Sequence, residues 1–194
     1  MTTLILGLVL FLGVHSISNV SPEFRNRCAA ALGEKAWQGL YALISIVGLV
    51  LVVRGYAVAR QAPVLLYAPP QWLKDWAVGL MIPVFPLLLA AYLPGRIRSA
   101  MRGNPMLVAT KLWATLHLAA NGALTDVVLF GAVLVWAVVT RISLKFRTPR
   151  PVPGAPPSPW NDAIAVAGGL AFYAIFILGG HLWLIGVPAY ARWP

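Results

Sequence analysis

The sequence has few charged residues and almost no cysteine. Only 10% of its 194 residues are charged, and five acidic residues stand against 15 lysines and arginines. A soluble domain of this composition would expose large apolar patches to water. The single cysteine, Cys28, excludes a disulfide framework, a thiolate metal cluster and the cysteine pair that covalent haem attachment needs. We therefore expect an integral membrane protein.

Six long apolar segments run through the chain. Each is close to or longer than the ~20 residues that cross a bilayer as an α-helix. The segments 105–122 and 123–142 also carry polar residues, among them Lys111 and Asp126. We predict an all-α fold, a polytopic membrane helix bundle with about six transmembrane helices, in a single domain that covers residues 1–194. The predicted spans are 2–20, 36–54, 74–93, 105–122, 123–142 and 162–187.

The basic residues are distributed unevenly between the two sides of the predicted membrane. They flank the spans instead of forming one stripe, so the net charge of +10 predicts no nucleic-acid partner. Loops rich in Lys and Arg stay in the cytoplasm, which places both termini on the opposite side. Membrane lipids then surround the bundle. The loops predicted to be cytoplasmic hold Arg25, Arg27 and Lys35, then Arg96, Arg98 and Arg102, with Lys111 a little inside the following span, and then Arg141, Lys145, Arg147 and Arg150.

Prolines mark one loop and one span. Residues 147–159 contain prolines at short intervals, which forbid helix and favour an extended connector between the last two spans. Docking of a partner is the alternative role for this loop. Pro83 and Pro86 fall inside the third span, where each removes a backbone donor. We predict a kink in that helix.

His117 is an ionisable ring within an apolar helix. Ionisable side chains in hydrocarbon are costly and usually functional. Thr110, Trp113, His117 and Asn121 follow one another at intervals of three, four and four residues, which places them on one helical face. We expect this face to point into the bundle, where it either joins helices through hydrogen bonds or binds a ligand.

Imidazoles on facing helices can hold a b-type haem, and all three histidines of the chain lie in predicted spans. His15 and His117 are the predicted iron ligands, with His181 as a substitute. His15 lies about 18 Å from the outer end of its span and His117 about 8 Å from the outer end of its own, so tilt has to bring them level. No Asp or Glu lies deep in a span, which argues against a carboxylate-rich di-iron site.

Other polar side chains complete the predicted haem b site. Lys111 lies six residues before His117, and it either snorkels to the membrane surface or pairs with an anionic group such as a haem propionate. A ligating imidazole needs an acceptor for its second ring nitrogen, and Asn121, Ser18 or Asn19 is expected to supply one. No residue is assigned a catalytic role. The predicted cofactor-binding residues are His15, His117, His181, Lys111, Asn121, Trp113 and Thr110, of which His15 and His117 bind the iron.

At these residues the chain resembles the NnrU family, which consists of bacterial multispanning membrane proteins. The resemblance extends over nearly the whole chain and rests on a combination of segments. It implies a multi-pass protein of the bacterial inner membrane, whose termini would then be periplasmic. The segments that carry it are Leu12–His15, Leu40–Leu51, Arg54–Tyr56, Ala91–Ile97, Asn104–Met106, Lys111–Gly122, Leu129–Gly131 and His181–Gly186.

The resemblance also implies a function. The family is named for genes associated with nitrite and nitric oxide reduction, which makes a nitrogen-oxide reductase system an expected partner. The family is similar to the membrane domain of 15-cis-zeta-carotene isomerase, in which a histidine-ligated b-type haem performs a redox-gated isomerisation, so haem-dependent redox or isomerase chemistry is expected here. One departure is Asn104-Pro105, where the family pattern often has His-Pro.

Two other functions fit the same residues. In a small-molecule or ion transporter the histidines would relay protons, with Asn121 and Thr110 along the path, although no internal repeat supports that class. In a non-catalytic membrane assembly protein the histidines would only join helices. A haem-binding protein linked to nitrogen-oxide metabolism, or to haem-dependent redox or isomerase chemistry, is the first hypothesis.

Overall fold

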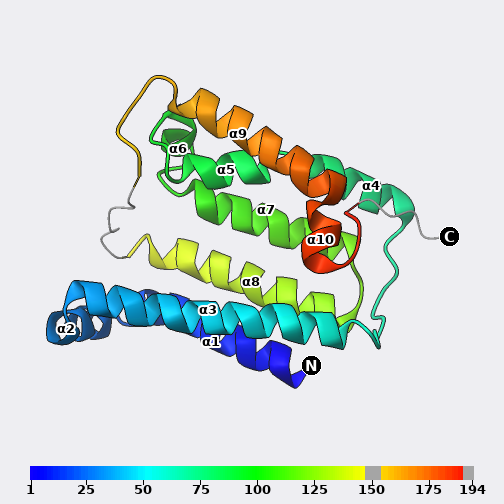
Figure 1. Ribbon diagram of the computed structural model, residues 1–194, viewed down its shortest axis with the longest axis horizontal. Coiled ribbons are helices and arrows are strands. Elements are labelled where there is room, and N and C mark those ends of the chain that lie inside the picture. The colour runs from blue at the N-terminus through cyan, green and yellow to red at the C-terminus, as the bar shows by residue number, and fades with distance from the viewer. Residues whose placement is uncertain (147–153, 190–194) are drawn as a thin grey trace. The chain divides into compact units, whose positions relative to one another are not determined.

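The structure is a computed structural model that describes residues 1–146 and 154–189, and its regular elements are helices (Figure 1). The predicted all-α fold is therefore confirmed. The helices form two compact units, each assembled from segments far apart in the sequence; unit 1 comprises Met1–Leu66 with Ala123–Thr148, and unit 2 comprises Tyr67–Gly122 with Pro149–Pro194. The prediction of a single domain stays a prediction. Of the predicted proline-rich loop, residues 147–153 lie outside the described ranges.

Five described helical segments are long and apolar enough to cross a membrane, and they agree with five of the six predicted spans. The sixth predicted span, 105–122, forms the apolar helix α7 (Pro105–Ala120), which has 16 residues. At 1.5 Å per residue α7 is about 24 Å long, against a hydrocarbon core of ~30 Å. Its crossing therefore stays a prediction. The five segments are Thr2–Val20, Glu34–Ala59, Gln71–Ala90, Leu124–Ser143 and Asn161–Ile185.

Unit 1 is built on close contact between two helices, α1 and α3, with α8 packed against α1 (Figure 1). Gly48 and Gly55 lie seven residues apart on one face of α3. A Cβ atom at Gly48 would run into the backbone of Phe11, and one at Gly55 into the backbone of Leu4. Glycine thus lets the two backbones approach, as small residues do in membrane bundles. The helices of unit 1 are α1 (Thr2–Val20), α2 (Pro22–Leu32), α3 (Glu34–Ala59) and α8 (Leu124–Ser143).

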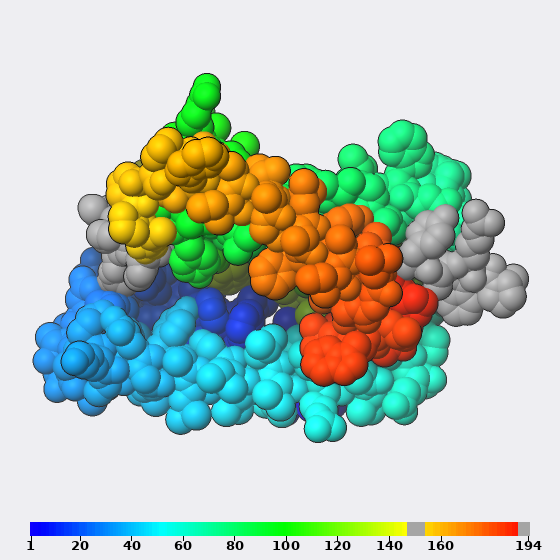
Figure 2. Space-filling view, turned by 45° about the horizontal axis from the view of Figure 1, so that its top comes forward, coloured from blue at the N-terminus to red at the C-terminus, as the bar shows by residue number. Residues whose placement is uncertain are grey.

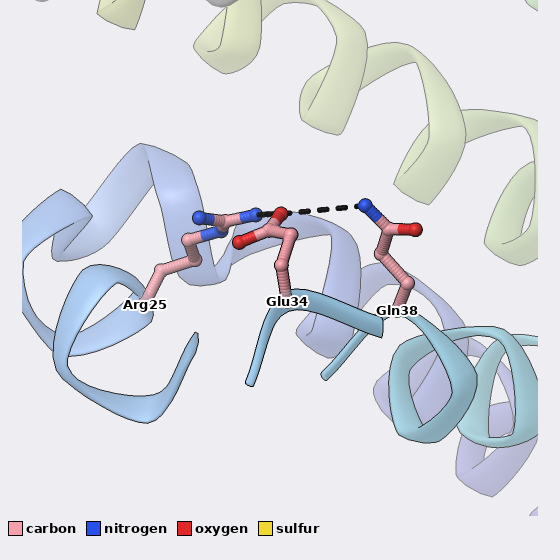
Figure 3. A network of polar contacts seen from close by, with 3 residues as sticks. All are labelled: Arg25, Glu34 and Gln38. Atoms are coloured by element: carbon pink, nitrogen blue, oxygen red, sulfur yellow. Dashed lines mark hydrogen bonds and ion pairs between the residues drawn. The ribbon is translucent and has the colours of Figure 1, made fainter. Parts of the chain in front are cut away.

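The short helix α2 turns the chain from α1 into α3. Ser21 caps its start, because the Ser21 hydroxyl accepts a hydrogen bond from the Phe24 amide at 3.2 Å. Arg25 forms an ion pair with Glu34, the first residue of α3, and Gln38 donates to the same carboxylate at 3.4 Å (Figure 3). Exposed contacts of this kind are individually weak, so the network adds local order to the turn more than overall stability.

Unit 2 places α5 between α7 and α9 (Figure 1). Its core consists of Val84 and Leu87 from α5 with Ala109 from α7. A Cβ atom at Gly169 would meet the backbone of Pro86, so this glycine lets α9 approach α5 closely. The helices of unit 2 are α4 (Gln71–Leu80), α5 (Val84–Ala90), α6 (Arg96–Ala100), α7 (Pro105–Ala120), α9 (Asn161–Ile175), the π-helical η1 (Phe176–Gly180) and α10 (His181–Ile185).

Where a kink was predicted in the third span, the helix is interrupted at residues 81–83, between α4 and α5. Pro83 has no backbone N–H, so the regular helical hydrogen bond to Gly79 cannot form. The Ile82 amide bonds the Gly79 carbonyl instead, at 3.2 Å. From α9, the Tyr173 hydroxyl donates to the Val78 carbonyl at 2.6 Å. A side chain of a neighbouring helix therefore supplies a hydrogen bond to the backbone at the break, as a membrane interior requires.

The turn before α6 is fixed by the first two residues of α9. The Asn161 side chain, which is 3% exposed, donates to the Pro94 carbonyl at 2.8 Å. The Asp162 carboxylate accepts hydrogen bonds from the amides of Arg96 at 2.7 Å and Ile97 at 3.1 Å. These bonds satisfy the free amides at the start of α6 and explain why the segment around Pro94 has a defined conformation.

Candidate functional site

In all three histidines, ring atom Nδ1 lies within hydrogen-bond distance of a backbone carbonyl oxygen. A carbonyl oxygen only accepts, so Nδ1 carries the proton and the lone pair lies on Nε2. Neutral imidazole in this form binds metals through Nε2, while the carbonyl fixes the orientation of the ring. In this tautomer a metal would bind through Nε2 of each ring. The pairs are His15 with Phe11 at 2.6 Å, His117 with Trp113 at 2.9 Å, and His181 with Val187 at 2.6 Å.

For His15 and His117 the carbonyl belongs to the residue four positions earlier, one helical turn back. The prediction that a side chain one turn after the histidine would be the acceptor is therefore wrong. In both residues the ring folds back onto the carbonyl of the preceding turn, whereas the side chains of Asn121 and Asn19 have other partners. Asn121 donates to the His117 carbonyl at 2.9 Å, and Asn19 donates to the Thr140 hydroxyl at 2.7 Å.

Three aromatic rings surround His15 in unit 1. The ring of Phe11 lies 4.4 Å from the imidazole, centroid to centroid, that of Tyr41 lies 5.2 Å away, and that of Trp136 lies 5.9 Å away at an interplanar angle of 87°. These rings come from α1, α3 and α8. The indole Nε1 of Trp136 is buried and has no hydrogen-bond partner in the described part of the chain. His15 is half-buried, so part of this residue is accessible at the surface of the unit.

On the predicted polar face of α7, Thr110 and Asn121 form hydrogen bonds with carbonyl groups of the same helix. The Thr110 hydroxyl donates to the Met106 carbonyl at 2.9 Å, and Asn121 is similarly engaged. Only the rings of Trp113 and His117 come together, 4.8 Å apart, and Trp113 also packs against the core of unit 2. The cofactor contacts predicted for Thr110, Trp113 and Asn121 stay predictions.

Lys111 is half-buried on α7. No ion pair of its ammonium group occurs within residues 1–146 and 154–189. A lysine in an apolar helix needs either water or an anion, because its charge is costly to leave in hydrocarbon. Both predicted roles, snorkelling and pairing with an anionic group, remain compatible with this position.

His181 follows an unusual stretch of helix. The π-helical η1 ends directly before it, and π-helical turns are rare and often found at functional sites. Gly186 then reverses the chain with a φ of 80°, which brings the Val187 carbonyl back to the ring. The Phe176 ring lies 5.5 Å from the imidazole. The surface formed by α9, η1 and α10 is seen in orange to red in Figure 2.

The three histidines are divided between the units. His15 belongs to unit 1, whereas His117 and His181 belong to unit 2. The predicted pairing of His15 with His117, and the substitution by His181, stay predictions. Among the described residues, no three His, Cys, Asp or Glu side chains gather as a metal site. That the chain has no carboxylate-rich di-iron site stays a prediction from the sequence.

Sequence reasoning missed Tyr41 and Trp136, the two neighbours of His15 with hydrogen-bonding groups. Nothing in the sequence around Trp136 distinguishes it from a residue that simply fills space in a membrane helix. Its significance comes from the packing of three helices, which periodicity does not show. Tyr41 lies seven residues after the start of α3, a position at which an aromatic residue is usually an interfacial anchor.

Apolar helices of spanning length and glycine-mediated helix contacts define an all-helical multi-pass membrane protein. A family model described as NnrU protein matches residues 3–189, essentially the whole chain. The chain therefore belongs to the NnrU family. Neither a curated protein nor a solved structure matches it significantly.

Proposed function

We propose that this NnrU-family protein binds haem b in the bacterial inner membrane and serves nitrite and nitric oxide metabolism through haem-dependent redox or isomerase chemistry. His15 and His117 are the proposed axial ligands, and His181 is the substitute. Lys111 is the proposed partner of an anionic group of the haem. The observation that carries this proposal is the distance from Nδ1 to a backbone carbonyl oxygen, which is 2.6–2.9 Å in all three rings and leaves Nε2 for a metal.

The residues around His15 fit the group chemically. Nε2 of His15 has a lone pair, and the ring is held by the Phe11 carbonyl on one side and by aromatic neighbours on the others. Haem held by two imidazoles would supply one-electron redox chemistry. The chain's own contribution is to orient each imidazole and to keep water away from it by apolar helices.

The test is the visible absorption spectrum of the full chain, purified in detergent after haem-replete expression, in the oxidised and reduced states. We expect a Soret band and the sharp bands of a six-coordinate, low-spin haem. His15→Ala and His117→Ala are expected to lose or shift these bands, whereas His181→Ala keeps them. Imidazole added to His15→Gly should restore the wild-type spectrum, which separates loss of a ligand from loss of folding.

Two results would refute haem binding by these residues. One is wild-type protein without a Soret band, and the other is a Soret band that none of the three histidine variants changes. A band that depends on His181 instead of His15 would retain the haem and replace one ligand. The metabolic role requires a second experiment, in which a host strain lacking the gene consumes nitric oxide slowly and is complemented by wild type but not by His117→Ala.

A further inference from the structure

Trp136 has a buried hydrogen-bond donor without an acceptor. Its Nε1–H is shielded from solvent and has no partner among the described residues. Buried polar groups in proteins are almost always paired, because an unpaired one loses its hydrogen bonds to water without replacement. An indole N–H only donates, so the missing partner has to be an acceptor. The unpaired donor lies beside His15, whose ring is 5.9 Å away.

Tyr41 offers a second donor in the same cluster. Its ring lies 5.2 Å from that of His15, and the described residues provide no hydrogen bond for its hydroxyl. Tyr41 is half-buried on α3, and Trp136 lies on α8. Two donors from two helices therefore flank one imidazole that is itself prepared for a metal. This arrangement suits a ligand that has both a metal and an acceptor group.

The depth of the cluster limits what that ligand can be. His15 lies about 8 Å before the end of α1, Trp136 about 10 Å before the end of α8, and Tyr41 about 10 Å after the start of α3. All three thus lie near the same end of unit 1. Basic residues collect at this end, which favours an anionic group: Arg25, Arg27, Lys35, Arg141 and Lys145.

Haem b has acceptors of this kind in its two carboxylates, while the rest of its edge is hydrocarbon. We propose that Trp136 and Tyr41 donate hydrogen bonds to a propionate carboxylate of haem b bound through His15. This inference rests on the proposed function. It assigns two positioning residues for the cofactor, and it sets the orientation of the haem, with its carboxylate edge toward the basic end of unit 1.

The experiment is a binding cycle on the full chain in nanodiscs, with haem b and with haem b dimethyl ester, whose carboxylates are blocked. Affinity is measured by titration of the Soret band for wild type and Trp136→Phe, which keeps a ring but removes the N–H. Trp160→Phe is the control, since Trp160 is 70% exposed. We expect Trp136→Phe to weaken haem b binding by roughly tenfold to a hundredfold. For the ester, the loss of affinity caused by Trp136→Phe should fall to about threefold or less. The control Trp160→Phe should change the affinity for neither haem form.

Each outcome decides a different claim. Equal losses for haem b and its ester would show that Trp136 does not recognise the charged carboxylate, and no loss would show that it makes no contact; both overturn the inference while haem binding stands. A wild-type protein that binds neither form refutes the proposed function itself. If Trp136→Phe does not fold, Tyr41→Phe is tested in the same cycle, and equal affinities for both haem forms in that variant and in wild type overturn the proposal.

Discussion

The hydroxyl of Tyr56 donates a hydrogen bond to Oδ1 of Asp126 across 2.7 Å, which joins α3 to the start of α8. Oδ2 of the same carboxylate accepts from the Ala123 amide at 3.1 Å. Asp126 is only 8% exposed, so water cannot replace a lost donor. Tyr56→Phe is expected to lower the free energy of unfolding by about 1.5–3 kcal/mol, the usual contribution of a hydrogen bond to a charged group.

This stability is measured by unfolding in mixed micelles with increasing dodecyl sulfate. Tyr92→Phe is the matched control, because it removes the same hydroxyl group from a tyrosine that is 49% exposed. Equal unfolding curves for Tyr56→Phe and the control would show that the Asp126 carboxylate does not depend on the tyrosine.

Two glycines of the same helix are expected to respond in opposite directions to alanine. Gly55→Ala introduces a Cβ atom against the backbone of Leu4, whereas Gly39→Ala meets nothing within 4 Å. We expect Gly55→Ala to lower the free energy of unfolding by about 1–3 kcal/mol through overpacking, and Gly39→Ala to raise it by up to about 1 kcal/mol through helix propensity. The same dodecyl sulfate titration measures both, and a stabilising Gly55→Ala would contradict the close packing of α1 on α3.

The bonds from Asp162 are expected to protect the turn before α6 from proteolysis. Asp162→Ala removes the acceptor of the Arg96 and Ile97 amides. Trypsin should then cleave after Arg96 or Arg98 roughly tenfold to a hundredfold faster, because local opening costs less free energy. Mass spectrometry of the fragments locates the cut. Asp75→Ala is the control, since Asp75 bonds only the Gln71 side chain on α4 among the described residues, and equal rates for both variants would dismiss the role of Asp162.

The only cysteine of the sequence reports the orientation of the chain. Cys28 lies on α2, in the first connection predicted to be cytoplasmic, and it is partly exposed. A membrane-impermeant maleimide should label it only after spheroplasts are opened. In a Cys28→Ala background, Gln61→Cys should be labelled in intact spheroplasts, since residue 61 follows α3 on the opposite side. Labelling of Cys28 from outside would invert the orientation.

The same chemistry shows whether α7 crosses the membrane. With α7 as a sixth span the two termini lie on one side, whereas with five crossings they lie on opposite sides. A cysteine at Ala155, introduced into the Cys28→Ala background, should be protected from the reagent in intact spheroplasts if α7 crosses. Labelling there would show that α7 does not span.

The spans were predictable because their signal is long and local. The first predicted span, 2–20, matches α1 to the residue, and the break at Pro83 follows from a missing N–H alone. The ends were less accurate for the second span, where α3 continues to Ala59 through Arg54. A single arginine near the end of an apolar helix extends to the membrane surface without ending the helix.

The surroundings of the histidines were less predictable than their positions. That the histidines lie in membrane helices follows from composition, but the proton on Nδ1 depends on a carbonyl of the preceding turn, and the partners of His15 depend on which helices pack against α1. Tyr41 and Trp136 are separated from His15 by 26 and 121 residues respectively. The contact between residues so far apart in the sequence is known only once the packing of α1, α3 and α8 is known.

The π-helical turn before His181 sets the direction in which this side chain leaves the helix. A turn of this kind accommodates one more residue than an α-helical turn, so it is equivalent to a single insertion in the helix. Deleting one residue between Phe176 and Gly180 would restore the ordinary register and rotate everything beyond it by about 100°. His181 would remain in the sequence and face another way, and the length of this segment is therefore as much a determinant of its role as the imidazole itself.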